Sequence, residues 1–330
     1  MMPAGLQRGS AVERPVSDLG QDDLVLPFAV APLDLRGRVV RLGPAIDHIL
    51  TQHRYPDAVS RLVGEAAALT ALLGSALKIE GRFQLQTKTD GVVDMLVVDF
   101  DAPDQLRAFA RFDAEKVEAA GRLTPAELLG RGHLALTIDQ GPEMSRYQGV
   151  VPLEGQGLEA AAHQYFTQSE QIPTMVRLAV AQSVTGRGSH WRAGGLLAQF
   201  LPESEDRRRR ADLDPGDAPP GFVRDAPEDD SWAEAKALAG TVEDHELVDP
   251  TLSSERLLYR LFHERGVTVF EAQALRDACR CSRERIEGML RSFTREERRD
   301  MIGPEARIGV TCEFCGVHRD FDPAEFDPMP

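Results

Sequence analysis

Cysteine is absent from the first 278 of the 330 residues and then occurs four times near the C-terminal end. The chain also lacks any run of about 18 apolar residues, so no segment is a candidate membrane-spanning helix. Its first 23 residues contain no apolar stretch of the kind that a secretory signal needs. We therefore expect a cytoplasmic protein, in which paired cysteines more often indicate metal or redox chemistry than structural disulfides.

Motifs of common enzymes are missing as well. The sequence has no phosphate-binding glycine loop, no G-x-S-x-G and no HExxH, and no pair of carboxylates stands out from its acidic background. We therefore predict that the chain is not an enzyme. Its net charge of -15 argues against binding to nucleic acid or to an anionic membrane. A length of 330 residues with 42% hydrophobic residues fits a globular protein of about two domains.

Residues 23–201 are predicted to form an α+β core with antiparallel sheets, after a loose tail at 1–22. Residues 24–54 read as one or two strands and a short helix, and "YPDAVSRLVGEAAALTALLGSALK" is the clearest helix of the chain. Small residues such as Gly64 and Ala67 in this helix suggest close packing against another element. A hairpin follows around Thr89-Asp90-Gly91, and several further strands follow with few helices between them.

Residues 202–270 are predicted to be a linker region. Its first part, 203–231, is an acidic, proline-rich insert without apolar periodicity, and the arginine run 207–210 within it is interpreted as a solvated charge cluster. A helix is predicted at 254–265, capped by Ser253 or Ser254. Its apolar face must be buried, and the core is the nearest apolar surface. The residues of that face are Leu257, Leu258, Leu261 and Phe262.

Residues 271–330 are predicted to form a small C-terminal domain that holds the four cysteines. Cys279 and Cys281 form a C-x-C pair, and Cys312 and Cys315 form a C-x2-C pair after thirty intervening residues. Two chelating pairs of thiols fit a Zn(Cys)4 site with one Zn2+ per chain, and a glycine follows the second pair as in a zinc knuckle. The main alternative metal is iron in a rubredoxin-like site. The main alternative to a metal site is a thioredoxin-type CxxC motif.

Two short helices are predicted between the cysteine pairs. Ser282 caps the first, whose buried residues should be Ile286, Met289, Leu290 and Phe293, and Thr294 begins a capping box for the second. Arg280 and Arg283 are expected to favour the thiolate form of the cysteines, together with the dipole of the first helix. His318 is expected to lie near the metal or at the surface without being a ligand.

The cysteine spacing and several longer segments together resemble the redox-regulated 33-kilodalton heat-shock chaperone family. The resemblance runs from about Asp23 to Phe321, and this chain departs from the family pattern in its acidic insert and its N-terminal tail. The segments that carry it are "RYPDAVSRLVGEAAALTALLGSALKIEGRF", "YQGVVPLEG", "YFTQSEQIPT", "AGGLLAQFLP", "LLYRLFHERGVTV" and "CRCSRERI".

The resemblance implies an ATP-independent holdase that binds unfolding client proteins under oxidative stress and is often a homodimer when active. It implies that the reduced, zinc-bound form is inactive, and that oxidation forms two disulfides, releases zinc and unfolds the C-terminal region. Closure of the shortest loops favours the pairs Cys279–Cys281 and Cys312–Cys315, as the family also suggests. The linker helix 254–265 is then the expected latch over the client-binding surface. Rival functions are a zinc-ribbon nucleic-acid-binding protein and a CxxC dithiol oxidoreductase.

Overall fold

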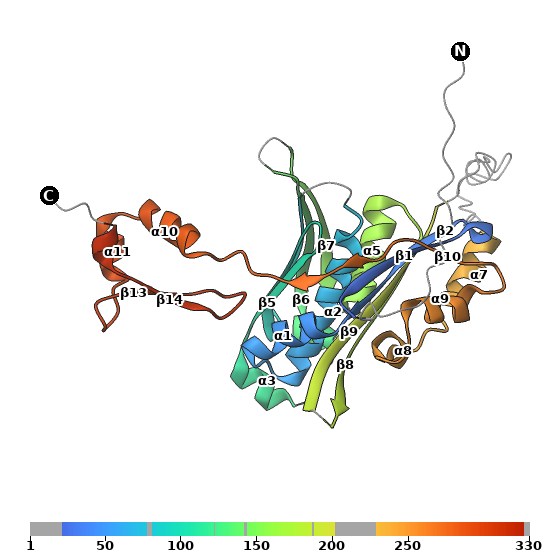
Figure 1. Cartoon of the computed structure of the whole chain (residues 1–330), viewed down its shortest axis with the longest axis horizontal. Coiled ribbons are helices and arrows are strands. Elements are labelled where there is room, and N and C mark those ends of the chain that lie inside the picture. The colour runs from blue at the N-terminus through green and yellow to red at the C-terminus, as the bar shows by residue number, and fades with distance from the viewer. Residues whose placement is uncertain are drawn as a thin grey trace, which may run out of the picture.

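The computed structural model describes residues 22–77, 81–121, 123–141, 144–186, 188–201 and 229–326. Within them it contains two six-stranded sheets and a small C-terminal unit with a two-stranded sheet (Figure 1). The predicted N-terminal tail lies outside the described residues except for its last residue. The acidic insert lies outside them except for residues 229–231, which begin helix α7.

Sheet A has the strand order β10-β1-β2-β9-β8, and β11 also pairs with β1. Sheet B has the order β12-β5-β4-β3-β6-β7. All pairings in the two sheets are antiparallel except β12 with β5, which is parallel. The strands of sheet A are β1 Leu24–Val30, β2 Leu35–Leu42, β8 Thr174–Thr185, β9 Gly188–Phe200, β10 Thr268–Val269 and β11 Gln273–Ala274. Those of sheet B are β3 Arg82–Thr89, β4 Val93–Asp101, β5 Gln105–Phe112, β6 Arg131–Asp139, β7 Tyr147–Glu154 and β12 Arg276–Asp277.

Helix α2, Asp57–Gly74, lies between the two sheets and is buried along nearly its whole length. Its glycines explain how close the packing is. A Cβ atom on Gly64 would lie 2.9 Å from Val180 in sheet A, and one on Gly74 would lie 2.6 Å from Phe100 in sheet B. The expectation that small residues in this helix mark close packing is therefore confirmed on both sides. The other helices around the sheets are α1 Pro44–His53, α3 Ala114–Ala120, α4 Pro125–Leu129 and α5 Leu158–Tyr165, with the short turns η1 Ala31–Leu33 and η2 Phe166–Glu170.

Sheet A is apolar on both faces, because each face is covered. Successive residues of a strand point to opposite faces, so Val40 and Leu197 join the core around α2 while Val39 and Leu196 face the other way. That second face is covered by three helices that follow the insert (Figure 1). These helices are α7 Asp230–Ala239, α8 Asp244–Val248 and α9 Ser254–Phe262. Strands β2 and β9 therefore contain nearly continuous apolar runs instead of a simple alternation.

The predicted fold class is confirmed: the protein is α+β with antiparallel sheets. The predicted linker helix begins at Ser254 as expected but ends at Phe262, three residues before the predicted end. The domain limits stay a prediction, and strand pairing bears on one of them. Residues 273–277, placed by sequence in the C-terminal domain, pair with β1 and β5 of the core.

Candidate metal centre and linker contact

The C-terminal unit is built on a small apolar cluster. It consists of α10 Arg283–Ser292, α11 Arg295–Asp300, the hairpin of β13 Ile308–Thr311 and β14 His318–Phe321, and the turn η3 Pro323–Glu325. Ser282 caps α10, and Thr294 with Glu297 forms the predicted capping box of α11. The expected burial of Met289 is wrong, since that side chain is 46% exposed. The buried residues of the cluster are Ile286, Leu290, Ile308, Phe321 and Phe326.

Cys312 and Cys315 lie in the tight turn between β13 and β14. The amide of Gly316 donates to the carbonyl of Cys312 at 2.8 Å, and the amide of Cys312 donates to the carbonyl of Val317 at 3.0 Å. Gly316 has φ of +64°, a left-handed conformation that glycine adopts without steric cost. The turn therefore has the knuckle form that the sequence predicted, with both thiols on its inner side.

The chain delivers Cys279 and Cys281 to this turn directly after β12. One ligand atom from each of the four cysteines lies within 4.8 Å of the other three. The nearest sulfur pairs are Cys279 with Cys312 at 3.6 Å and Cys281 with Cys315 at 3.3 Å. A tetrahedral Zn(Cys)4 site with Zn–S bonds of about 2.3 Å has sulfurs about 3.8 Å apart. The donor set and its spacing therefore fit a single tetrahedral metal ion.

The thiols differ in acidity because they share hydrogen bonds. Burial raises the pKa of Cys279, but hydrogen bonds from the other cysteines outweigh it and lower that pKa to about 7. Burial raises the pKa of Cys312 and, more strongly, that of Cys315, which also faces the sulfur of Cys281. Four adjacent thiolates repel one another unless a cation lies between them. The cluster is therefore suited to a metal cation that replaces the protons.

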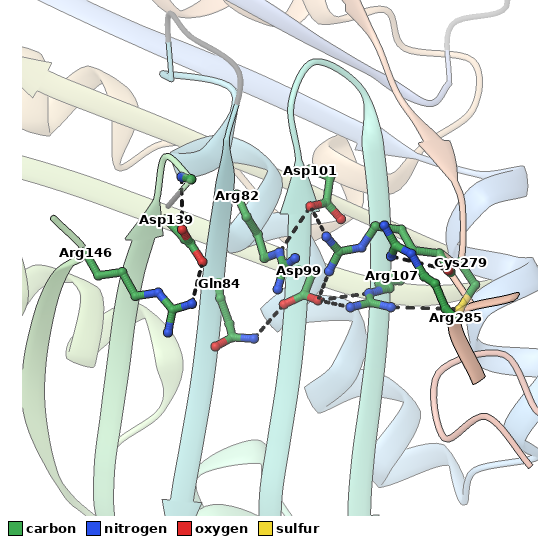
Figure 2. A network of polar contacts seen from close by, with 11 residues as sticks. Arg82, Gln84, Asp99, Asp101, Arg107, Asp139, Arg146, Cys279 and Arg285 are labelled. Atoms are coloured by element: carbon green, nitrogen blue, oxygen red, sulfur yellow. Dashed lines mark hydrogen bonds and ion pairs between the residues drawn. The ribbon is translucent and has the colours of Figure 1, made fainter. Parts of the chain in front are cut away.

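Two arginines contact the sulfurs, and neither is one that the sequence indicated. Arg107 Nη1 lies 3.9 Å from Cys279 Sγ (Figure 2). Arg319 Nη1 donates to Cys281 Sγ at 3.4 Å. Arg280 instead pairs with Asp101 of β4 at 3.0 Å. Arg283 faces Glu287 and Glu325. The assignment of Arg280 and Arg283 to the thiols was therefore wrong.

No local signal in the sequence connects Arg107 to a cysteine 172 residues later. His318 stands outside the cluster, as expected, and bonds to Thr311 and Asp320.

The four apolar residues of α9 lie against the outer face of sheet A. Leu257, Leu258 and Phe262 are fully buried and Leu261 is 4% exposed. The ring of Phe262 stacks on Phe28 of β1, with 5.7 Å between the ring centroids. The predicted burial of this helix face on the core is present in the structure.

A polar contact that the sequence did not reveal holds α8 on the same face. Arg41 of β2, 1% exposed, donates to the carbonyls of Glu246 at 2.8 Å and Asp249 at 2.9 Å. Arg192 of β9 donates to the carbonyl of Val248 at 2.6 Å. Burial, and next the charge of Arg192, lower the pKa of Arg41 to about 10, so its guanidinium is still charged at neutral pH. The two cations thus occupy the carbonyl end of α8, where positive charge is favoured.

The approach of α8 also requires a glycine in β9. A Cβ atom on Gly194 would lie 2.1 Å from the carbonyl oxygen of Leu247, so no other residue fits without moving the helix. The neighbouring Gly195 faces α2 on the opposite side, 3.0 Å from Leu72. These two adjacent glycines therefore allow α8 and α2 to pack closely on the two faces of β9.

The fold and the site together define an α+β protein with a helical segment over one sheet and a C-terminal four-thiol centre suited to a metal. Residues 23–322 match the family model described as Hsp33 protein. The chain belongs to the Hsp33 family, a family of chaperones, and chaperones are not a class of enzyme. Both the family and the chaperone function expected from the sequence are thereby supported.

Individual relatives agree over nearly the whole chain. The 33 kDa chaperonin of Caulobacter vibrioides is 47% identical over 306 residues, which are 92% of this chain and 95% of the relative. The 33 kDa chaperonin of Pseudomonas fluorescens is 34% identical over 94% of each chain. The crystal structure of the Thermotoga maritima 33 kDa chaperonin superposes with a TM-score of 0.72 at 19% identity, covering 92% of this chain and 96% of that one. No helix among the described residues is long and apolar enough to cross a membrane.

Proposed function

We propose that this chaperone is a redox-regulated, ATP-independent holdase of the cytoplasm. In this proposal the reduced protein holds one Zn2+ on Cys279, Cys281, Cys312 and Cys315 and is inactive. Oxidation of these thiols unfolds the C-terminal region and uncovers a surface that binds unfolding client proteins. The active form is a homodimer, and neither nucleic acid nor a membrane is a partner. The observation that carries the proposal is the thiol cluster joined through β12 and a short segment to the helices that cover sheet A.

The small size of the C-terminal unit supports control by oxidation. Its apolar cluster has only five buried side chains, too few for about 50 residues to fold stably without a further cross-link. A bound Zn2+ supplies that cross-link, and small zinc domains draw about 10–16 kcal/mol from it. Loss of the thiolate ligands therefore removes the main support of the unit.

The oxidation step is proposed to form the bonds Cys279–Cys281 and Cys312–Cys315. For each pair, two thiolates and one hydrogen peroxide take up two protons and give one disulfide and two waters. The near contacts of 3.6 and 3.3 Å join sulfurs of different pairs. In a tetrahedron every sulfur neighbours every other, so these contacts do not select a pairing. Closure of the shortest loop favours the local pairs.

The client surface is proposed to consist of the outer face of sheet A and the apolar side of α9. The four apolar residues of α9 contribute about 6–12 kcal/mol of burial at about 1.5–3 kcal/mol each, an upper bound because an unfolded linker stays partly collapsed. The zinc term is at least as large. We propose that its loss releases the linker, because the segment after α9 then has no folded unit at its end.

An aggregation assay tests the proposal. A chemically denatured model protein is diluted into buffer with reduced or peroxide-treated chaperone, and light scattering is followed with and without ATP. We expect suppression by the oxidised form only, unchanged by ATP, and loss of suppression after re-reduction. Equal scattering with both forms would refute the redox control. Reduction of insulin by the protein would instead identify a dithiol oxidoreductase.

A further inference from the structure

The C-terminal unit docks on the outer face of β5 through the knuckle turn. Phe314 lies between the two cysteines of that turn. The guanidinium carbon of Arg107 is 3.9 Å from the centroid of the Phe314 ring, and the centroid of the Phe109 ring is 6.2 Å from it. The carbonyl of Phe314 accepts a hydrogen bond from His53 Nε2 at 2.9 Å. The metal centre is therefore held against the core by groups that belong to the core.

Beneath this contact lies an unusually buried pair of charges. Asp99 of β4, with a side chain 1% exposed, accepts from Arg107 Nε at 2.9 Å (Figure 2). It also lies 3.6 Å from Arg280 Nη2. Asp101 pairs with Arg280 at 3.0 Å and with Arg82 at 3.1 Å. Three arginines thus share two carboxylates, which leaves one positive charge in excess before the thiols are considered.

The sulfurs supply the missing negative charge. Arg107 faces Cys279, and Arg319 adds a fourth guanidinium beside Cys281. One divalent cation with four thiolates carries two negative charges, so the four arginines, two carboxylates and the metal–thiolate cluster together are neutral. Two disulfides without an ion carry no charge. The same site then has two positive charges in excess. In the docked structure with free thiols, the side chains of Arg107 and Arg280 are only 15% and 22% exposed.

We propose that the attraction between Arg107 and the thiol cluster holds the C-terminal unit on the core, and that it does so only while the cluster is anionic. Arg107 is in this sense a positioning residue of the redox switch. Oxidation consumes the thiolates as written above, two electrons going to each peroxide, and so removes the anionic sulfur partner of Arg107 when the disulfides form, while the pair with Asp99 stays. Undocking is then an electrostatic event that adds to the melting of the unit. The inference rests on the proposed redox function, but its first test does not depend on chaperone activity.

Docking of the C-terminal unit and the reduced, anionic state of the cluster must also stabilise each other, because coupling between two equilibria is reciprocal. If the anionic cluster favours docking, docking favours the anionic cluster by the same factor. Removal of the Arg107 charge should therefore undock the reduced unit and also speed the reaction of its thiols with peroxide. A hydrogen bond from a guanidinium also lowers the nucleophilicity of a thiolate, which acts in the same direction.

Hydrogen exchange of the full-length, reduced, metal-loaded protein measures docking directly. The amides of Arg276 and Ala278 donate to the carbonyls of Asp104 and Leu106 at 2.9 and 3.1 Å, so they report on the junction of β12 with β5. In Arg107→Met we expect exchange at 276–278 to rise about 10-fold, with metal content and the protection of β13 and β14 unchanged. Release of metal at a fixed peroxide concentration should also be about 10-fold faster, which corresponds to about 1.4 kcal/mol.

Arg111→Met is the matched control. Arg111 lies on the same strand and face, four residues on, and pairs with the exposed Asp94 at 2.8 Å. It should behave as wild type, and Arg107→Lys, which keeps the charge, should lie within about threefold of wild type. The proposal is overturned if Arg107→Met exchanges and oxidises as wild type does, or if Arg107→Lys is as impaired as Arg107→Met.

A second variant guards against misfolding. Arg107→Met leaves the buried carboxylate of Asp99 with fewer partners. Asp99→Asn combined with Arg107→Met removes both charges of this pair. It should give the same loss of docking in a folded core, and protected 276–278 amides in this variant would overturn the proposal. The holdase proposal fails separately, if oxidised wild type does not suppress aggregation. That result would leave the exchange measurements on the reduced protein standing.

Discussion

Replacing Leu258 and Phe262 of α9 with serine should release the linker without any oxidation. Both side chains are fully buried against sheet A, and Phe262 stacks on Phe28. Loss of their burial costs about 3–6 kcal/mol at about 1.5–3 kcal/mol each. Two hydroxyl groups placed in the apolar contact add about 1–3 kcal/mol each if they stay unpaired. The change therefore removes at least half of the apolar stabilisation of α9.

The assay compares this double variant with wild type, both reduced and metal-loaded. We expect partial suppression of client aggregation and faster proteolysis within 232–270, with metal content unchanged because the thiol cluster is untouched. Tyr259→Ser is the matched control, since Tyr259 lies on the same helix and is 65% exposed. It should remain inactive and resistant.

One result would refute the reasoning. If the double variant is as inactive as wild type and equally resistant to protease within 232–270, α9 is not the latch. Metal content must be measured as well, because activity that accompanies metal loss would originate in the C-terminal unit and not in the release of α9. Only activity in the metal-loaded variant supports a latch at α9.

Four further outcomes follow from the structure. Reduced protein should contain one Zn2+ per chain, released by a mercurial and read with a chromogenic chelator; iron in place of zinc would contradict this. Peptide mapping after peroxide should find the C-x-C and C-x2-C disulfides, the second forming more readily, and mainly cross-pair links would show the loop argument to be wrong. Arg41→Met removes the charged donor to the carbonyls of Glu246 and Asp249. It should loosen α8 by about 3 kcal/mol and increase hydrogen exchange at 246–249 in the reduced protein, and unchanged exchange there would contradict this. Burial raises the pKa of Glu65 to about 8. Its neutral form therefore contributes stability that is complete below about pH 4.5 and is lost as pH rises through 8. Glu65→Gln should flatten the fall in melting temperature over that range, and an unchanged pH profile would show that Glu65 is ionised in the folded protein.

Much of the candidate metal centre was predictable because its signals are local in sequence. The two thiols of each pair are separated by only one or two residues, so both can bind the same ion. Gly316 marks the left-handed turn of the knuckle. The apolar face of α9 was predictable for the same reason, since helical period places Leu258 and Phe262 on one side. The prediction failed for Met289, because the C-terminal unit is too small to cover both sides of α10.

The sequence by itself determined the α+β class, the four candidate ligands and the buried face of the linker helix, because each depends on residues a few positions apart. Only the tertiary structure decided which charges meet. Arg107 lies 172 residues before Cys279 and Arg41 lies 205 residues before Glu246, and their side chains meet these partners through the pairing of strands and the packing of helices on sheets. Arg280 was misassigned for this reason: its nearest neighbours in sequence are thiols, but β12 lies against β5 and brings it to the carboxylates of β4. A charge is paired with what the fold brings close, and periodicity along one chain carries no information about partners 200 residues away.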